Sequence, residues 1–190
     1  MRIPALAFAV LAAAIALAAC TTGSAGPSFQ TALATKSGTV DAGEAAALIS
    51  AYRQSKGKSA VHVDPTLMAI ARVHSNRMAA ADTMTHVLPG EGSFQDRLRA
   101  GGYQAGMAAE NVAAGQTTLA EVLQAWKNSP SHNENLLEEH IDEIGIAVSI
   151  ASGGKYKYFW TLVLGKKRPT NMGGPAGGFI TENGATLTIN

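Results

Sequence analysis

Three stretches of this sequence place titratable side chains where predicted helices or strands end, and such side chains can do chemistry. Residues 84–86 end in His86, residues 109–115 contain Glu110, and residues 126–133 contain His132. Imidazole and carboxylate groups that share a site can form a general acid/base pair or bind a metal ion. His86 and Glu110 are 24 residues apart, and Glu110 and His132 are 22 apart. No local zinc motif joins them, so only a tertiary fold could bring these three side chains together.

Capping residues and apolar spacing predict the helices that would position these stretches. The first helix is expected over residues 41–55, with Asp41 as its N-cap, and the second opens at Asp64, where proline follows at the first turn. Ser93 begins a third helix that stops at the glycine pair 101–102, and Thr118 begins a fourth. A short turn of helix is expected after Pro130.

Two strands are expected after the helices. Apolar residues alternate with small ones over residues 144–150, and a second alternating run covers residues 156–164, with a Ser-Gly-Gly turn at residues 152–154. This pattern predicts a β-hairpin with a buried face. Helices first and strands last predict an α+β layered domain, not a parallel sheet built from βαβ units.

Composition excludes some classes of protein. The 190-residue chain is 46% apolar, carries a formal charge of +1, and has one cysteine, Cys20. A disulfide framework within one chain is therefore impossible. Without Arg2, the one charge of residues 1–19, basic and acidic residues balance at 14 each. No nucleic-acid partner is expected, because such binding rests on the neutralisation of phosphates.

The first twenty residues have the anatomy of a signal peptide. Arg2 precedes an apolar run, and small residues lead to the cysteine in Leu17-Ala18-Ala19-Cys20. That ending resembles a bacterial lipobox, in which the peptidase cuts before a cysteine that is then acylated. We expect a signal peptide over residues 1–19, a lipid on Cys20, and a membrane as partner. Thr21 favours the outer membrane if the host is Gram-negative.

The remaining chain divides by composition. Residues 20–40 are small and polar and predict a lipidated, flexible tether. Residues 41–167 hold the periodic segments and predict one domain. Residues 168–190 predict a glycine-rich tail whose Asn183-Gly184 pair favours a C-terminal hairpin.

Six ordered blocks over roughly residues 42–166 carry a family resemblance. They are His86, Asp96-Arg97-Leu98 with Gly102-Tyr103, Glu110-Asn111-Val112-Ala113, Trp126 with Ser129-Pro130 and His132, Asn135-Leu136-Leu137, and Glu143-Ile144-Gly145-Ile146. In this order they resemble the bacterial branch of the CAP superfamily, whose members carry an SCP domain. The superfamily includes cysteine-rich secretory proteins, antigen-5 and plant pathogenesis-related proteins.

The resemblance implies a three-layer α-β-α sandwich with an antiparallel sheet and a solvent-facing cleft. It implies His86, Glu110 and His132 as cleft residues that bind a ligand. The second glutamate of eukaryotic members has no clear counterpart here, because residues 127–129 contain no acid, and Ser131 replaces the usual glycine.

Several roles remain open for these three residues. They could line a binding cleft for a small ligand, a lipid or an envelope partner, or bind zinc, for which two histidines and a glutamate form an open site. They could serve an envelope hydrolase, although no nucleophile in an elbow motif accompanies them. They could also form a structural scaffold that orders loops.

Other polar residues near these stretches have simpler explanations. His74 lies on the apolar side of its predicted helix and is expected in the core, whereas His62 and His140 are expected at the surface. Asp82 and Glu91 flank His86 and could orient it, or could serve as capping and solvent-exposed residues.

Overall fold

The computed structural model describes residues 38–169, 178–182 and 185–189. Within them, five helices and six strands follow one another along the chain. The helices are α1 (Ala42–Ser55), α2 (Pro65–Ala81), α3 (Phe94–Ala100), α4 (Leu119–Asn128) and α5 (Pro130–Leu137). The strands are β1 (His62–Val63), β2 (Ala105–Ala114), β3 (Glu143–Ile150), β4 (Tyr158–Lys167), β5 (Gly178–Glu182) and β6 (Ala185–Ile189).

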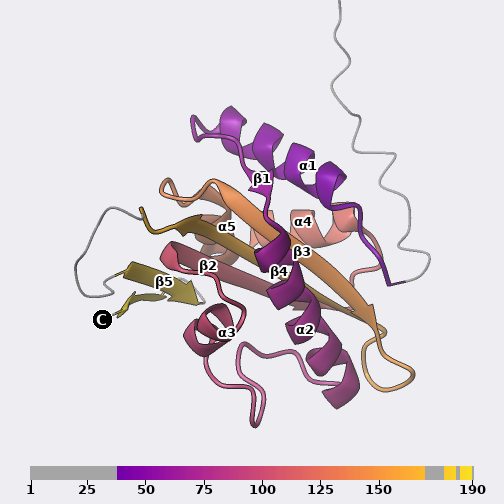
Figure 1. Cartoon of the computed structure of the whole chain (residues 1–190). Coiled ribbons are helices and arrows are strands. Elements are labelled where there is room, and N and C mark those ends of the chain that lie inside the picture. Colours follow the sequence, from indigo (N-terminus) through magenta and orange to yellow (C-terminus); the bar gives the residue numbers. More distant parts are fainter. Residues whose placement is uncertain (1–37, 170–177, 183–184, 190) are drawn as a thin grey trace, which may run out of the picture.

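The sheet lies between two layers of helices (Figure 1). Side chains of α1, α4 and α5 share one apolar cluster with one face of the sheet, and side chains of α2 and α3 share another with the opposite face. This arrangement confirms the expected α+β fold with three layers. It forms because each helix has one apolar side, which must be buried against another element.

The sheet is mixed and mostly antiparallel, with strand order β1-β3-β4-β2-β5-β6. The pairs β2–β4, β3–β4 and β5–β6 are antiparallel, whereas β1–β3 and β2–β5 are parallel. The parallel pairs join strands that are far apart in sequence, and a parallel pair needs such a long crossover connection. Sequence spacing alone did not reveal them.

Local capping explains where the helices begin. Asp41 accepts a hydrogen bond from the backbone N–H of Glu44, and Asp64 accepts one from Leu67. Reciprocal capping boxes open α3 at Ser93 and α4 at Thr118. These N-caps confirm the helix starts expected from the sequence.

Strand β3 is buried on both faces, although the sequence predicted one buried face. Ile144, Ile146 and Val148 belong to the cluster with α1 and α4, while Ala147 packs in the cluster with α2. A Cβ atom on Gly145 would lie 2.1 Å from the backbone carbon of Leu67. The absence of a side chain at Gly145 therefore lets α2 approach the sheet closely.

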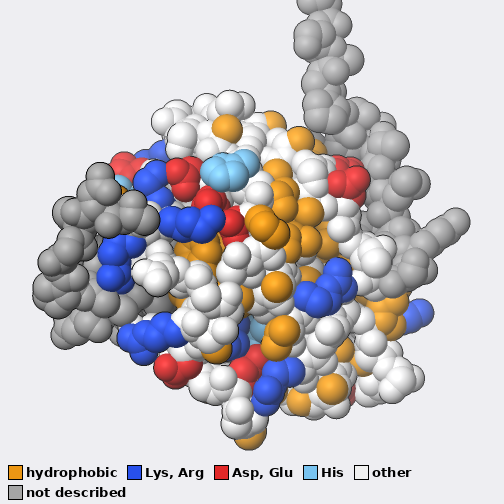
Figure 2. Space-filling model, viewed as in Figure 1, with side chains coloured by type: hydrophobic (Ala, Val, Ile, Leu, Met, Phe, Trp, Pro, Cys, Tyr) orange, Lys and Arg blue, Asp and Glu red, His pale blue; other side chains and the backbone are white. Residues whose placement is uncertain are grey.

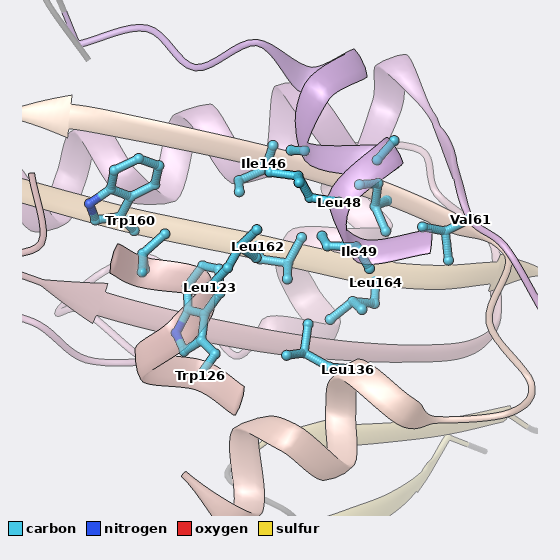
Figure 3. Close-up of a cluster of buried hydrophobic side chains, with 14 of the residues drawn as sticks. Leu48, Ile49, Val61, Leu123, Trp126, Leu136, Ile146, Trp160, Leu162 and Leu164 are labelled. Carbon is cyan, nitrogen blue, oxygen red and sulfur yellow. The ribbon is translucent and has the colours of Figure 1, made fainter. Parts of the chain in front are cut away.

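The larger core cluster lies between the three strands β2, β3 and β4 and the layer of α1, α4 and α5 (Figure 3). Trp126 and Trp160 are buried there, and each indole N–H has a carbonyl partner. Trp126 donates to Val112 O at 3.3 Å, and Trp160 donates to Gln116 O at 2.8 Å. These bonds satisfy the polar end of each ring inside the core.

The predicted export signal, the lipidated tether and the C-terminal tail lie largely outside the described residues. Cys20, the signal peptide and residues 20–37 of the tether lie there, as does the Asn183-Gly184 turn. Strands β5 and β6 on either side of that turn pair with each other, and β5 pairs with β2. Across the described residues, no helix is both long and apolar enough to cross a membrane.

Candidate functional site

His86 and Glu110 are in direct contact. His86 lies in the loop between α2 and α3, and its Nδ1 is 2.9 Å from Oε1 of Glu110 on β2. The Glu110 side chain is fully buried, and that of His86 is 11% exposed. An ionised carboxylate can only accept hydrogen bonds, so Nδ1 of His86 is the donor. A neutral His86 ring therefore carries its proton on Nδ1.

Arg97 holds the Glu110 carboxylate from the other side. Its Nη1 donates to Oε2 at 2.6 Å and its Nη2 to Oε1 at 2.9 Å. Nη2 also donates to the backbone carbonyl of His86 at 2.8 Å. Arg97 thus fixes both the carboxylate and the loop that carries the histidine. Sequence reasoning missed this residue, although its place beside Leu98 in the matched block was a usable signal.

These contacts decide the charge of Glu110. Burial alone would raise the pKa of this carboxyl, but hydrogen bonds from Arg97 and His86 and the charges of Arg97 and His74 lower it to about 2. Favourable charge-assisted hydrogen bonds outweigh desolvation here. Glu110 is therefore a fixed anion at neutral pH.

A second buried pair lies beside the first. Nδ1 of His74 on α2 is 2.9 Å from both oxygens of Glu91, and its Nε2 is 2.9 Å from Thr85 O. Both ring nitrogens therefore lie at hydrogen-bond distance from oxygen atoms. His74 also lies 3.9 Å from Glu110 Oε1. It is buried as expected, but it is part of an ionic cluster and not an apolar packing residue.

The two acids expected to flank His86 have other partners. Glu91 binds His74, as described above. Asp82 accepts hydrogen bonds from the backbone N–H groups of Lys155 at 2.7 Å and Tyr156 at 3.3 Å. Asp82 therefore holds the β3–β4 loop, and Glu91 holds a residue of α2.

Asn111 follows Glu110 in β2 and faces the opposite side of the sheet. Its Nδ2 donates to His132 O at 3.0 Å, and its Oδ1 accepts from Asn135 Nδ2 at 2.9 Å. Successive side chains of a strand point to opposite faces. The Glu-Asn pair therefore ties the α2–α3 layer and α5 to the same point of β2.

His132 lies on α5, and Arg53 of α1 helps to hold that helix in place. Arg53 is buried and donates to the carbonyls of Leu136 at 2.8 Å and Glu138 at 2.9 Å. The ring of His132 bonds Ser129 Oγ through Nδ1 at 2.9 Å. Burial and then the charge of His86 lower the pKa of His132, so the two imidazoles influence each other across the site.

The structure brings His86 and Glu110 into contact, but it does not bring His132 to the carboxylate. Among the residues that the structure describes, the side chains on the Glu110 carboxylate are Arg97, His86 and His74, which belong to the α2–α3 layer. Within the described ranges, no group of three or more His, Cys, Asp and Glu side chains is arranged to hold a metal ion. The expected zinc set does not fit this arrangement, because Arg97 occupies both oxygens of its only carboxylate.

The remaining histidines lie at the surface, as expected. The side chain of His62 is 66% exposed and that of His140 is 67% exposed. Their partners are acids near the start of β3, far along the chain from the Glu110 cluster. They take no part in the site.

The three-layer fold and the His86–Glu110 contact define a CAP-type domain, and comparison with known families agrees. Residues 46–164 match the CAP model, described as the cysteine-rich secretory protein family. The chain belongs to this family and is of its bacterial type.

Several bacterial relatives are similar to this chain. The uncharacterized protein YkwD of Bacillus subtilis is 36% identical over 99 residues, which cover 52% of this chain and 38% of YkwD. An outer surface protein of Borrelia burgdorferi is 25% identical with a TM-score of 0.60, covering 68% of this chain and 98% of that one. An extracellular protein of Bacillus anthracis with an SCP domain is 28% identical with a TM-score of 0.58, covering 65% of this chain and 39% of that one. The chain thus spans well under half the length of two of these relatives.

Proposed function

We propose that this protein is an exported, lipid-anchored binding domain of the bacterial cell envelope. Its CAP domain would present the polar site around His86 and His132 to a small ligand, a lipid or an envelope partner. Cys20 would carry the anchor. The observation that carries the binding role is the Arg97–Glu110–His86 array, in which a buried anion is fully paired and fixed in place.

Two observations support export to the cell envelope. The Leu17-Ala18-Ala19-Cys20 ending follows a charged start and an apolar run. The two solved relatives with similar folds are named as an extracellular protein and an outer surface protein. Both names agree with an exported chain.

The electrostatics favour binding over hydrolysis. A general base works best when its pKa lies near the working pH, whereas the pKa of Glu110 is about 2. Arg97 also covers both carboxylate oxygens. Glu110 is therefore suited to orient His86 and not to exchange protons with a substrate.

Native mass spectrometry tests the binding role. The full chain is purified from envelopes, mixed with extracted envelope lipids and small molecules, and measured for retained mass. We expect a discrete added mass that His86→Ala and His132→Ala each abolish while the far-ultraviolet circular dichroism is unchanged. His62→Ala, at an exposed histidine outside the site, is the matched control and should retain the added mass.

A structural role for the polar cluster is the second candidate, because the buried Arg97–Glu110 ion pair also ties α3 to β2. If the cluster only stabilises the fold, His86→Ala should lower the melting temperature strongly. In that case the wild type should show no added ligand mass for the variant to lose. A stable His86→Ala variant that loses the added mass contradicts the structural role. Intact mass of the native chain tests the anchor separately, because an unmodified thiol at Cys20 contradicts it.

A further inference from the structure

We propose that one end of the domain docks flat on an anionic lipid bilayer, which deepens the proposed function and rests on its lipid anchor. We call this surface the docking end and define it by Met84, Ile150, Lys155 and Lys157. Gly38, where the described chain begins, lies beside Ile150, since a Cβ on Gly38 would be 3.4 Å from the Ile150 side chain. The occupant is the membrane to which Cys20 would attach.

Hydrogen bonds gather three distant segments at this end. Arg72 of α2 donates from Nη1 to Gly38 O at 2.9 Å and to Val148 O at 3.0 Å, near the end of β3. Asp82, at the end of α2, binds the backbone of the β3–β4 loop at Lys155. Figure 1 shows the end of α2, the β3–β4 loop and the start of the described chain at the same end of the molecule.

The exposed side chains of the docking end combine apolar and basic character. Met84 is 50% exposed and Ile150 is 39% exposed, two of the few large apolar residues that the fold leaves in solvent. Lys155 and Lys157 are exposed on the loop beside them, and Figure 2 shows apolar and basic side chains next to one another there. The carboxylate of Asp82 is turned towards the backbone N–H groups of Lys155 and Tyr156, from which it accepts hydrogen bonds.

Half-buried aromatic rings complete this pattern. Tyr156 and Tyr158 alternate with the two lysines, and the Lys155 and Lys157 ammonium groups lie 4.9 and 5.7 Å from their ring centres. Tyrosine and lysine are the side chains that favour the boundary between hydrocarbon and lipid headgroups. Basic residues near an anionic surface add attraction that salt screens.

The proposed anchor makes so small a surface sufficient. Residues 21–37 separate Cys20 from Gly38, and even fully extended that segment spans at most about 60 Å. Attachment would turn docking into an intramolecular event at high effective concentration. A surface too weak to recruit a free domain can then orient a tethered one.

Docking would also set the position of the ligand site. His86 follows Met84 by two residues in the same loop. A docked domain would therefore hold the His86 loop close to the headgroup region. Ligands that the site takes up could come directly from the bilayer.

Site-specific fluorescence on the full lipidated chain tests the proposal. An environment-sensitive dye is attached to Met84→Cys or Ile150→Cys, and to Glu139→Cys as the control, in vesicles of three parts phosphatidylcholine to one part phosphatidylglycerol. Glu139 precedes the start of β3, at the opposite end of that strand from Ile150. We expect blue-shifted emission and several-fold lower iodide quenching at positions 84 and 150, with position 139 unchanged.

Charge reversal provides the matched comparison. Lys155→Glu with Lys157→Glu should restore iodide quenching at position 150, because each lysine near an anionic surface contributes about fivefold to binding. Lys56→Glu with Lys58→Glu, at the opposite end, should not. Vesicles of phosphatidylcholine alone should behave as the reversed variant does.

The outcomes separate the anchor from the docking. If the chain floats with vesicles but the dyes at positions 84 and 150 are quenched as readily as the dye at 139, the docking proposal is overturned while the anchor stands. If the chain does not float and Cys20 is a free thiol, the anchor is wrong and the docking proposal falls with it.

Discussion

Arg97 and Glu110 form a two-point ion pair inside the domain, with Nη1–Oε2 at 2.6 Å and Nη2–Oε1 at 2.9 Å. The pair joins α3 to the centre of β2. The same carboxylate holds the His86 ring, whose Nδ1 lies 2.9 Å from Oε1 of Glu110. Both charged side chains are almost completely removed from solvent, at 5% and 0% exposure. This pair sets the position and hydrogen bonding of the candidate site.

Removing the guanidinium of Arg97 should lower the free energy of unfolding strongly. Arg97→Met leaves a buried carboxylate without its main partner, for which a loss of about 3–5 kcal/mol in the free energy of unfolding is expected. Urea denaturation measures it. Arg99→Met on the same helix is the control. Arg99 is 58% exposed and pairs with the equally exposed Asp96, so a change within about 0.5 kcal/mol is expected. Similar losses in the two variants would contradict the assigned role of Arg97.

Glu110 should make the stability of the fold depend on pH in the acidic range. Its pKa in the fold is about 2, against an ordinary value of 4.5, so the unfolded chain takes up this proton more readily than the folded one. The stability that Glu110 contributes is present above pH 4.5 and is lost as the pH falls towards 2. Urea titrations of wild type and Glu110→Gln at pH 7, 4.5, 3 and 2 should show a difference that shrinks over this window. A difference that stays constant would refute it.

His132 should titrate below its ordinary range. Burial first, and then the charge of His86, lower its pKa, so the folded state resists protonation and loses stability as the pH falls below about 6.5. Nuclear magnetic resonance titration of the ring protons measures this pKa directly. His86→Ala should raise it only in part, because burial remains. An unshifted His132 in the wild type would show that its ring is freely solvated.

The close approach of α2 to the sheet predicts a sharp difference between two glycines. Gly145→Ala would place a Cβ 2.1 Å from the Leu67 backbone, whereas a Cβ on Gly153 meets nothing within 4 Å. Overpacking of this kind costs about 1–3 kcal/mol or more. Thermal melts should show a clear loss for Gly145→Ala and almost none for Gly153→Ala. Equal melting temperatures would mean that α2 is not packed as described.

Zinc affinity should be weak in the wild type. Arg97 occupies the Glu110 carboxylate, and His132 does not contact it, so the residues do not form the open three-ligand site that zinc prefers. Calorimetry at pH 7.5 should give the same heats for the wild type and for His86→Ala combined with His132→Ala. A tight site in the wild type that the double variant lacks would reverse this conclusion.

Much of the fold was predictable because its signals are local. Asp41, Asp64, Ser93 and Thr118 each bond a backbone N–H within three residues, so the helix starts could be read directly from the sequence. The alternation over residues 144–150 predicted β3, although it could not show that helices cover both of its faces. The ordered blocks also predicted the family that the match over residues 46–164 establishes.

The candidate site could be predicted only in part. The sequence by itself determined which residues can do chemistry, namely His86, Glu110 and His132. Only the tertiary structure decided how they are used: Arg97 takes the carboxylate, His74 joins the ionic cluster, and His132 remains apart from Glu110. The physical reason is that these relationships depend on packing between layers. Glu110 faces the α2–α3 layer and its neighbour Asn111 faces α5, so the partners of a side chain depend on which elements cover each face of β2, and sequence spacing does not encode that.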